Sequence, residues 1–434
     1  MGQKLENCWM ILPGHKVGYG DIEIEGDEIA AVVVRQQAYD NKGNRLVLPG
    51  LVNCHGHTAM TLVRGLGSGL PLQRWLEEAI FPVEAKMKPE DVYAGTAWGV
   101  REMLAGGTTS VADMYDFPGD CARAFEAGGM KARVCRVGLS FVEGRLGDCV
   151  EFTRGFNSCA SLTSGEDAAS PLVSADLCVH SEYLTDEAFC RGLAEANKEL
   201  KRPLHFHVSE TEKEHRECIE RHGKTPIAYL ASTGILDHGG YAAHCVWCTD
   251  DDFRIMAEKG VSLIHNPTSN MKLGSGFARV GRAMELGVNV ALGTDGCASN
   301  DNLDMFEEMH IASLIHKGLA KDPTALSAWD VLDMATVNGA KALGMSDTGE
   351  IAVGKKADLC VVDLDKPHLM PCLDIPNLIV NSMHASDVLE TWVDGKRVYE
   401  KGLVGLEGLG GLERKAFLAA VKRIGLNNLT GGNE

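Results

Sequence analysis

The pattern of hydrophobic and polar positions changes near residue 49. Residues 1–48 contain short stretches of period two, such as DIEIEGDEIAAVVV, separated by Gly and Asp. This pattern is typical of short β-strands. From residue 49 onward, short apolar runs alternate with amphipathic segments such as residues 91–107, which is the rhythm of repeated β/α units. After residue 350 the pattern returns to short extended pieces.

The repeated units predict an α/β fold, a (β/α)8 barrel of the TIM type. Such a barrel carries its chemistry at the carboxyl ends of the strands. A doubly wound open sheet is the alternative. The predicted strands are residues 50–57, 108–115, 131–140, 176–183, 202–210, 240–245, 261–267 and 288–295.

The pattern also predicts how the chain divides into domains. The barrel is expected over residues 49–349, and residues 1–48 and 350–405 are expected to pair into one small β-sandwich domain. Residues 406–434 are expected to form a C-terminal helix and tail.

Composition and charge narrow the possible partners. The chain has 434 residues, 45% of them hydrophobic, and a formal net charge of −18. This negative charge disfavours nucleic acid and anionic membranes, so a small-molecule substrate is expected. No apolar run is long enough for a membrane helix. The 14 cysteines show no disulfide spacing, which indicates reduced thiols and a cytoplasmic protein.

Side chains that can bind a metal fall at the carboxyl ends of several predicted strands. His55 and His57 are two residues apart, so in a strand they point to the same side. Imidazoles together with a carboxylate suit one divalent cation, Zn²⁺ or Fe²⁺, and a bound cation lowers the pKa of water to about 7. The strand-end residues are His55, His57, His207, Glu210, His244 and Asp295.

Two further histidines are expected to have supporting roles. His205 shares a face with His207 but lies one step deeper in the strand, so it is expected to be a core residue or to support a ligand. His265 is expected either to face the mouth of the barrel or to be structural.

Several motifs resemble the amidohydrolase superfamily, and within it the 5′-methylthioadenosine/S-adenosylhomocysteine deaminases and their chlorohydrolase-like relatives. The matching stretches occur in the same order as in the family and extend over nearly the whole chain. The matching stretches are LPGLVNCHGHT, LPLQRWLEEAIFPVEAKM, HFHVSETEKE, AAHCVWCTDDD, HNPTSNMKLGSG, GTDGCASNDNLDMFEEM and GKKADLCVVDLD.

The resemblance implies a site for one metal per subunit, held by His55, His57, His207 and Asp295. His244 would position the attacking water, Asp295 would take a proton from it, and Glu210 would protonate the substrate ring. Family members that hold two metals carry a lysine at the end of the fourth strand. This chain has DLCVHSEY there, without lysine.

The resemblance also implies substrate contacts. Glu84 would bind the ribose hydroxyls and His180 the purine, while Arg136 and Arg145 would lie near the 5′ substituent. Trp75 is expected either to form an apolar wall for that substituent or simply to be packed.

The expected activity is hydrolytic deamination of adenine nucleosides: 5′-methylthioadenosine, S-adenosylhomocysteine, 5′-deoxyadenosine or adenosine. Glu182 stands where relatives have proline, which leaves the exact substrate open. The alternatives are deamination of another purine, a pterin or a triazine, hydrolytic dehalogenation, or a non-catalytic scaffold like the dihydropyrimidinase-related proteins. The family implies a homo-oligomer.

Overall fold

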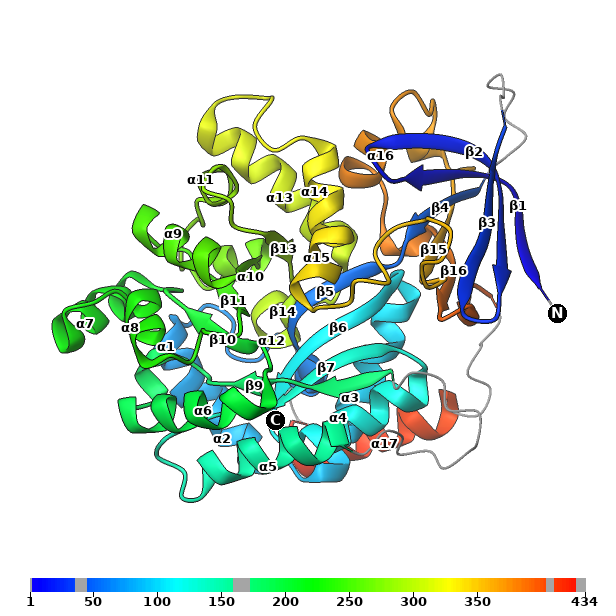
Figure 1. Ribbon diagram of the computed structural model, residues 1–434. Coiled ribbons are helices and arrows are strands. Elements are labelled where there is room, and N and C mark those ends of the chain that lie inside the picture. Colours follow the sequence, from blue (N-terminus) through cyan, green and yellow to red (C-terminus); the bar gives the residue numbers. More distant parts are fainter. Residues whose placement is uncertain (1, 36–44, 159–171, 403–409, 427–434) are drawn as a thin grey trace, which may run out of the picture.

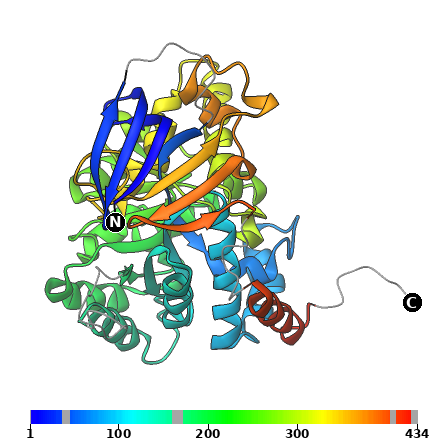
Figure 2. The ribbon, with the colours of Figure 1, turned by 90° about the vertical axis from the view of Figure 1, so that its right-hand side faces the viewer.

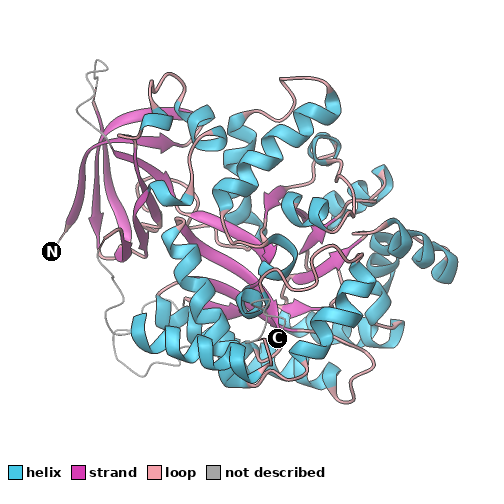
Figure 3. Ribbon diagram, turned by 180° about the vertical axis from the view of Figure 1, so that it is seen from behind, coloured by secondary structure: helices cyan, strands magenta, loops and turns pink. Residues whose placement is uncertain are grey.

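The structure is a computed structural model that describes residues 2–35, 45–158, 172–402 and 410–426 (Figure 1). Two sheets of parallel strands form the centre of the larger part, and helices surround them (Figure 3). One sheet has the order β14 (Asp295–Gly296), β5 (Leu51–His57), β6 (Thr108–Tyr115), β7 (Lys131–Arg136), β8 (Val173–Ala175). The other has the order β9 (Leu177–Cys178), β10 (Leu204–Val208), β11 (Gly240–His244), β12 (Val261–His265), β13 (Val290–Leu292).

The predicted α/β class and parallel strands are confirmed. Neighbouring strands follow chain order in the second sheet and from β5 to β8 in the first, where β14 pairs with β5 at the edge. One apolar cluster contains Val52 and Ala112 from the first sheet together with Ile264 and Ala291 from the second. The two sheets therefore pack against each other through their side chains.

The fourth and eighth strands are each divided between the two sheets. The bounds predicted for the fourth, residues 176–183, are wrong: its two parts, β8 and β9, lie on either side of Asp176, and the second ends at Cys178. The buried Asp176 carboxylate binds the Arg202 guanidinium at 2.6 Å and the Tyr241 hydroxyl at 2.9 Å. These side-chain bonds anchor the chain at the point where it passes from one sheet to the other.

Helices follow the strands, and capping residues mark where a helix begins and ends. Helix α9 is an example: the Thr249 hydroxyl accepts from the Asp252 amide, and the Asp252 carboxylate accepts from the Thr249 amide. It ends at Gly260, whose φ of +67° favours glycine. The helices are η1 (Thr58–Val63), α1 (Leu72–Arg74), η2 (Trp75–Ile80), α2 (Phe81–Glu84), α3 (Pro89–Ala105), α4 (Pro118–Gly128), α5 (Arg145–Ser158), η3 (Glu182–Leu184), α6 (Glu187–Leu200), α7 (Glu212–His222), α8 (Pro226–Thr233), α9 (Asp250–Lys259), α10 (Pro267–Lys272), α11 (Val280–Glu285), α12 (Cys297–Asn300), α13 (Met305–Ala320), α14 (Ala328–Ala335), α15 (Val337–Ala342), η4 (Pro367–Leu369), α16 (Ile375–Asn381), η5 (Ala385–Asp387) and α17 (Gly410–Arg423).

A third sheet contains strands from the N-terminal and C-terminal parts of the chain (Figures 1 and 2). β4 pairs with β15 in antiparallel fashion, so an N-terminal strand lies beside a C-terminal one. Lys131 of β7 ties this sheet to the rest of the molecule, because its ammonium lies 2.6 Å from the carboxylates of both Asp358 and Asp394. The sheet has the order β17 (Lys396–Glu400), β16 (Val388–Val393), β15 (Leu359–Asp363), β4 (Arg45–Pro49), β1 (Gln3–Leu12), β2 (Lys16–Glu25), β3 (Glu28–Val34).

The C-terminal helix packs on the outside of α3 (Figure 2). The rings of Trp98 and Phe417 stack at 5.0 Å, and Arg423 pairs with Glu90 at 2.6 Å. None of the helices in the described ranges is long and apolar enough to cross a membrane.

Candidate functional site

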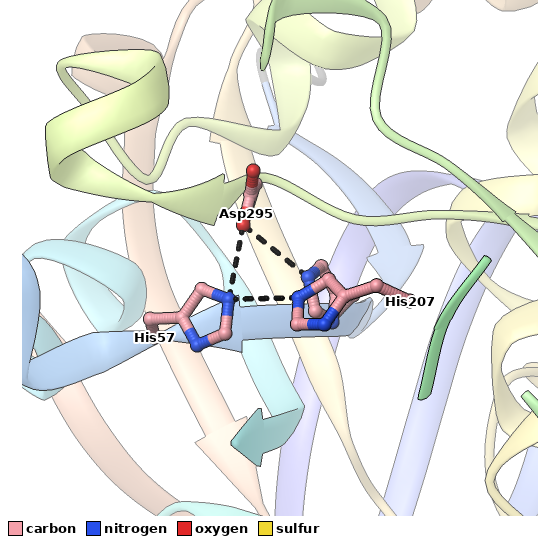
Figure 4. Close-up of side chains that lie close together, drawn as sticks. His57, His207 and Asp295 are labelled. Atoms are coloured by element: carbon pink, nitrogen blue, oxygen red, sulfur yellow. Dashed lines mark hydrogen bonds and ion pairs between the residues drawn. The ribbon is translucent and has the colours of Figure 1, made fainter. Parts of the chain in front are cut away.

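Four predicted ligands converge at the strand ends. One atom each from His55, His57, His207 and Asp295 lies within 4.8 Å of the others. They come from β5, β10 and β14, elements far apart in the sequence. Figure 4 shows His57 and His207 facing each other, with the Asp295 carboxylate directed at His57.

The three imidazoles turn their Nε2 atoms toward one point. His57 Nδ1 donates to the Met114 carbonyl at 2.6 Å, and His207 Nδ1 donates to the His180 carbonyl at 2.8 Å. His55 Nδ1 shares a hydrogen bond of 2.8 Å with His205, as expected for a histidine that supports a ligand. Anchoring Nδ1 in this way leaves Nε2 free to bind a metal. The buried Nε2 of His55 has no hydrogen-bond partner among the described residues.

The Asp295 carboxylate completes the donor set. Its Oδ1 lies 3.2 Å from His55 Nε2 and 3.3 Å from His57 Nε2. Its Oδ2 accepts hydrogen bonds from Ser269 at 2.6 Å and Ser299 at 2.8 Å. Two hydroxyls therefore hold one oxygen while the other faces the imidazoles. Three nitrogens and one carboxylate oxygen fit Zn²⁺ or a similar divalent cation.

The backbone is strained at the strand ends that carry these side chains. Asp295 has a φ of +62°, His244 of +72° and Ser209 of +47°, a region that non-glycine residues adopt rarely. Such conformations persist only where the surrounding contacts impose them, and they cluster at functional sites. Gly293 is required nearby, since a Cβ there would lie 2.8 Å from the backbone nitrogen of His55.

Burial favours the neutral form of the ligand imidazoles, whereas the Asp295 charge favours the protonated form. Burial lowers the pKa of His55 to about 4 and that of His207 well below its usual value. Burial also acts to lower the pKa of His57, but the hydrogen bond and charge of Asp295 outweigh it and raise this pKa to about 9. At neutral pH, protein stripped of metal therefore holds one proton on the His57–Asp295 pair.

We expect metal affinity to rise with pH for this reason. Below pH 9 the metal must displace the proton of His57, so the dissociation constant should fall by about tenfold per pH unit between pH 7 and 9 and then level off. Competition with a chelator of known affinity across this range measures the slope. An affinity that is constant from pH 7 to 9 would contradict the assigned protonation.

His244 and Glu210 form the adjoining wall. His244 Nε2 lies 3.8 Å from the Glu210 carboxylate, and His244 Nδ1 bonds Asn270 Oδ1 at 2.8 Å. Burial acts to lower the pKa of His244, but the Glu210 charge overcomes this and raises it. Burial raises the pKa of Glu210, with His244 opposing. The Glu210 carboxyl group therefore holds a proton more readily than the carboxyl group of an exposed glutamate.

These groups form the floor of a cavity of about 460 Å³. The predicted substrate residues Glu84, His180 and Trp75 all line it. Glu84 accepts a hydrogen bond of 2.6 Å from the Tyr115 hydroxyl, and Trp75 donates to the Leu66 carbonyl at 3.0 Å. The cavity is large enough for a nucleoside-sized ligand.

Other sequence-predicted residues lie outside this lining. Arg136 and Arg145 are not among the described residues that line the cavity; both pair with Asp116, which does. His265 lies against His316, with 3.1 Å between their Nε2 atoms, which favours its structural interpretation. Glu182 points to α7, where it binds Arg221 at 2.6 Å and His222 at 2.8 Å.

Several supporting residues were missed from the sequence. Ser269 and Ser299 hold Asp295, and Asn270 orients His244. Glu214 accepts from the backbone amides of Ser209 and Glu210, both at 2.8 Å. Both serines lie in quoted motifs, HNPTSN and GTDGCASN, but only the fold shows that their hydroxyls meet one carboxylate.

The fold and the site together define a parallel α/β protein with a mononuclear metal centre at its strand ends, the arrangement that activates water for hydrolysis. The chain belongs to the amidohydrolase family, whose profile matches residues 46–398. The resemblance noted in the sequence motifs is confirmed.

Three similar proteins illustrate the relationship. The 5-methylthioadenosine/S-adenosylhomocysteine deaminase of Acetivibrio thermocellus is 44% identical over 388 residues, which cover 89% of this chain and 88% of the relative. The 5′-deoxyadenosine deaminase of Methanosarcina mazei is 44% identical, with 87% of each chain covered. The crystal structure of an adenosine deaminase from Xanthomonas campestris with bound zinc has a TM-score of 0.86 at 32% identity, covering 95% of this chain and 97% of the other.

Proposed function

We propose that this protein is a metal-dependent deaminase of adenine nucleosides, which releases ammonia and leaves the corresponding inosine analogue. The observation that carries the proposal is the convergence of three imidazoles and one carboxylate, of which His57, His207 and Asp295 line a nucleoside-sized cavity. The names of the relatives support adenine nucleosides as the substrate class. A non-catalytic scaffold is disfavoured, because all four ligands are present.

The architecture proposed for this activity is a closed (β/α)8 barrel over residues 49–349. Its support is that the divided fourth and eighth strands each contribute to both parallel sheets. Residues 1–48 and 350–405 would form the small β-domain, as a sandwich. Residues 406–434 would form the C-terminal helix and tail, and the tail beyond residue 426 lies outside the described residues. A homo-oligomer and a cytoplasmic location stay predictions.

We assign the metal to His55, His57, His207 and Asp295, and the zinc in the Xanthomonas relative favours zinc. A bound divalent cation lowers the pKa of water to about 7 and polarises the group under attack. The serine hydroxyls on Asp295 Oδ2 and the carbonyls on the imidazoles keep the donors oriented.

Proton transfers fall to the two buried carboxyl groups. Asp295, ionised at neutral pH, accepts a proton from the attacking water while the water oxygen bonds to the ring carbon that carries the amino group. Glu210 donates a proton to the adjacent ring nitrogen, which takes up the electron pair of the broken π bond. Asp295 then passes the proton that it accepted to the amino nitrogen. As the carbon–nitrogen bond breaks and ammonia leaves, the hydroxyl group on the ring carbon gives its proton to the Glu210 carboxylate and becomes the carbonyl of the product. His244 orients the water, because its Nδ1 is held by Asn270.

The remaining lining residues suit the nucleoside. Glu84 would accept from the ribose hydroxyls, His180 would contact the purine and Trp75 would form an apolar wall. Arg136 and Arg145 would act on the 5′ end only through Asp116, the carboxylate that separates them from the cavity.

We expect Glu84→Gln to raise KM for nucleosides by about 10- to 100-fold with a smaller effect on kcat, because a charged acceptor is worth about 1.5–3 kcal/mol. Steady-state kinetics with 5′-deoxyadenosine measure the change. Tyr115→Phe is the matched control: it removes the hydroxyl that bonds Glu84 but leaves the carboxylate, so its effect should be smaller. A Glu84→Gln variant that loses kcat at unchanged KM would argue against ribose binding here.

A spectrophotometric assay tests the activity itself. Purified, zinc-loaded protein is incubated with adenosine, 5′-deoxyadenosine, 5′-methylthioadenosine, guanine and a pterin, and ammonia is measured in parallel. Loss of adenine absorbance with stoichiometric ammonia supports the proposal. Inert nucleosides with turnover of a free base would overturn the substrate class and favour one of the alternatives.

A further inference from the structure

Most of the side chains that line the cavity are apolar. Apart from Glu84, Glu210 and Asp295, the acidic group in the described lining is Asp116, which follows β6. Within the described lining, no lysine or arginine is present. The apolar lining residues of this region include Trp75, Phe81, Phe117, Leu139 and Phe141.

The two arginines nearest this region are already paired. Arg145 is buried, and its guanidinium donates to Asp116 Oδ1 at 2.8 Å and to the Val137 carbonyl at 2.9 Å. Arg136 lies 3.7 Å from Asp116 and 3.8 Å from Asp148. Asp116 thus faces both positive charges, and its side chain, about half exposed, is the member of this group that lines the cavity.

A nucleoside bound as proposed would place its 5′ end near Asp116, which lines the same cavity as Glu84. Asp116 is near enough to Glu84, the proposed ribose acceptor, for its charge to help raise the pKa of that carboxyl, after the larger effect of burial. A ribose held by Glu84, with its base toward Glu210, would direct its 5′ substituent toward the apolar wall and Asp116.

Resting on the proposed function, we infer that Asp116 is a specificity-determining residue that selects adenine nucleosides with an uncharged 5′ substituent over S-adenosylhomocysteine. The homocysteine carboxylate would face a like charge and lose water against apolar side chains, while Arg136 and Arg145 already pair with Asp116. Its ammonium group could approach Asp116, but only by competing with Arg145. A deoxy, methylthio or other neutral 5′ substituent is neither repelled by Asp116 nor required to lose the water bound to a charged group.

The test compares kcat/KM for 5′-methylthioadenosine, 5′-butylthioadenosine and S-adenosylhomocysteine. The butylthio compound is neutral but long, so it separates charge from size. We expect S-adenosylhomocysteine to be at least about tenfold poorer than the butylthio compound at low salt, and the gap to narrow as ionic strength rises. This measurement uses the native protein and does not depend on a variant that folds.

Asp116→Asn should raise the ratio of S-adenosylhomocysteine to butylthio activity by about tenfold, because it removes the negative charge that Arg145 and Arg136 share. Asp148→Asn is the matched control: Asp148 also pairs with Arg136 but is not among the described lining residues, so the ratio should not change. Native protein that uses both compounds equally, or an unchanged ratio in Asp116→Asn, overturns this inference alone. If none of the three nucleosides is deaminated, the proposed function fails and the inference with it.

Discussion

Replacing Asp295 by asparagine is expected to lower kcat by about 10⁴-fold and to release most of the bound metal. Asp295 supplies the single negative charge among the four ligands, and its Oδ1 is the atom that faces His55 and His57. The neutral amide would weaken the metal site and could not accept the proton of the attacking water. Metal content by mass spectrometry and kcat under saturating substrate measure the two effects.

Ser299→Ala provides the graded control for this variant. It removes one of the two hydroxyls on Asp295 Oδ2 but keeps the carboxylate. Metal affinity should fall by about 10- to 100-fold, the usual effect of losing a group that orients a ligand. An Asp295→Asn protein that keeps stoichiometric metal and more than a tenth of native kcat would show that Asp295 is neither ligand nor base.

Replacing Glu210 by glutamine is expected to lower kcat by about 10³-fold while metal content stays at one per chain. Glu210 is buried beside His244 but is not among the four converging ligands. Because burial raises its pKa, the native carboxyl holds its proton at higher pH than an exposed glutamate, and activity should fall as pH rises through that pKa. The glutamine variant should lack this limb of the pH–rate profile.

Glu214→Gln separates proton donation from the local fold. Glu214 binds the backbone amides of Ser209 and Glu210, so its loss disturbs the Glu210 segment without removing the Glu210 carboxyl. Burial raises the pKa of Glu214 to about 7, and this variant should retain the limb assigned to Glu210. If Glu210→Gln keeps the native pH profile, another group must protonate the ring.

The strand ends explain why so much of the metal centre could be predicted. Short apolar runs, bounded by turn residues, end at His55 and His57, at His207 and at Asp295. The sequence alone therefore indicates that these runs are strands and where each strand ends. Parallel strands bring such ends to one edge, whatever their separation along the chain. The predicted ligand set is therefore the one found within 4.8 Å.

Interactions between distant side chains could not be predicted in the same way. The division of the fourth strand depends on Asp176 meeting Arg202 and Tyr241, which no local pattern records. The pairing of Arg145 with Asp116 is of the same kind, and it changes the expected contact of the arginine with substrate. Sequence periodicity gives the direction of a side chain but not its partner.

The most direct test of the central claim is an anomalous difference map at the zinc edge, from crystals grown with one equivalent of zinc. We predict one peak per chain, about 2.0–2.2 Å from the Nε2 atoms of His55, His57 and His207 and from an Asp295 oxygen. A peak elsewhere, or imidazoles that point into separate pockets with no density between them, would contradict the account.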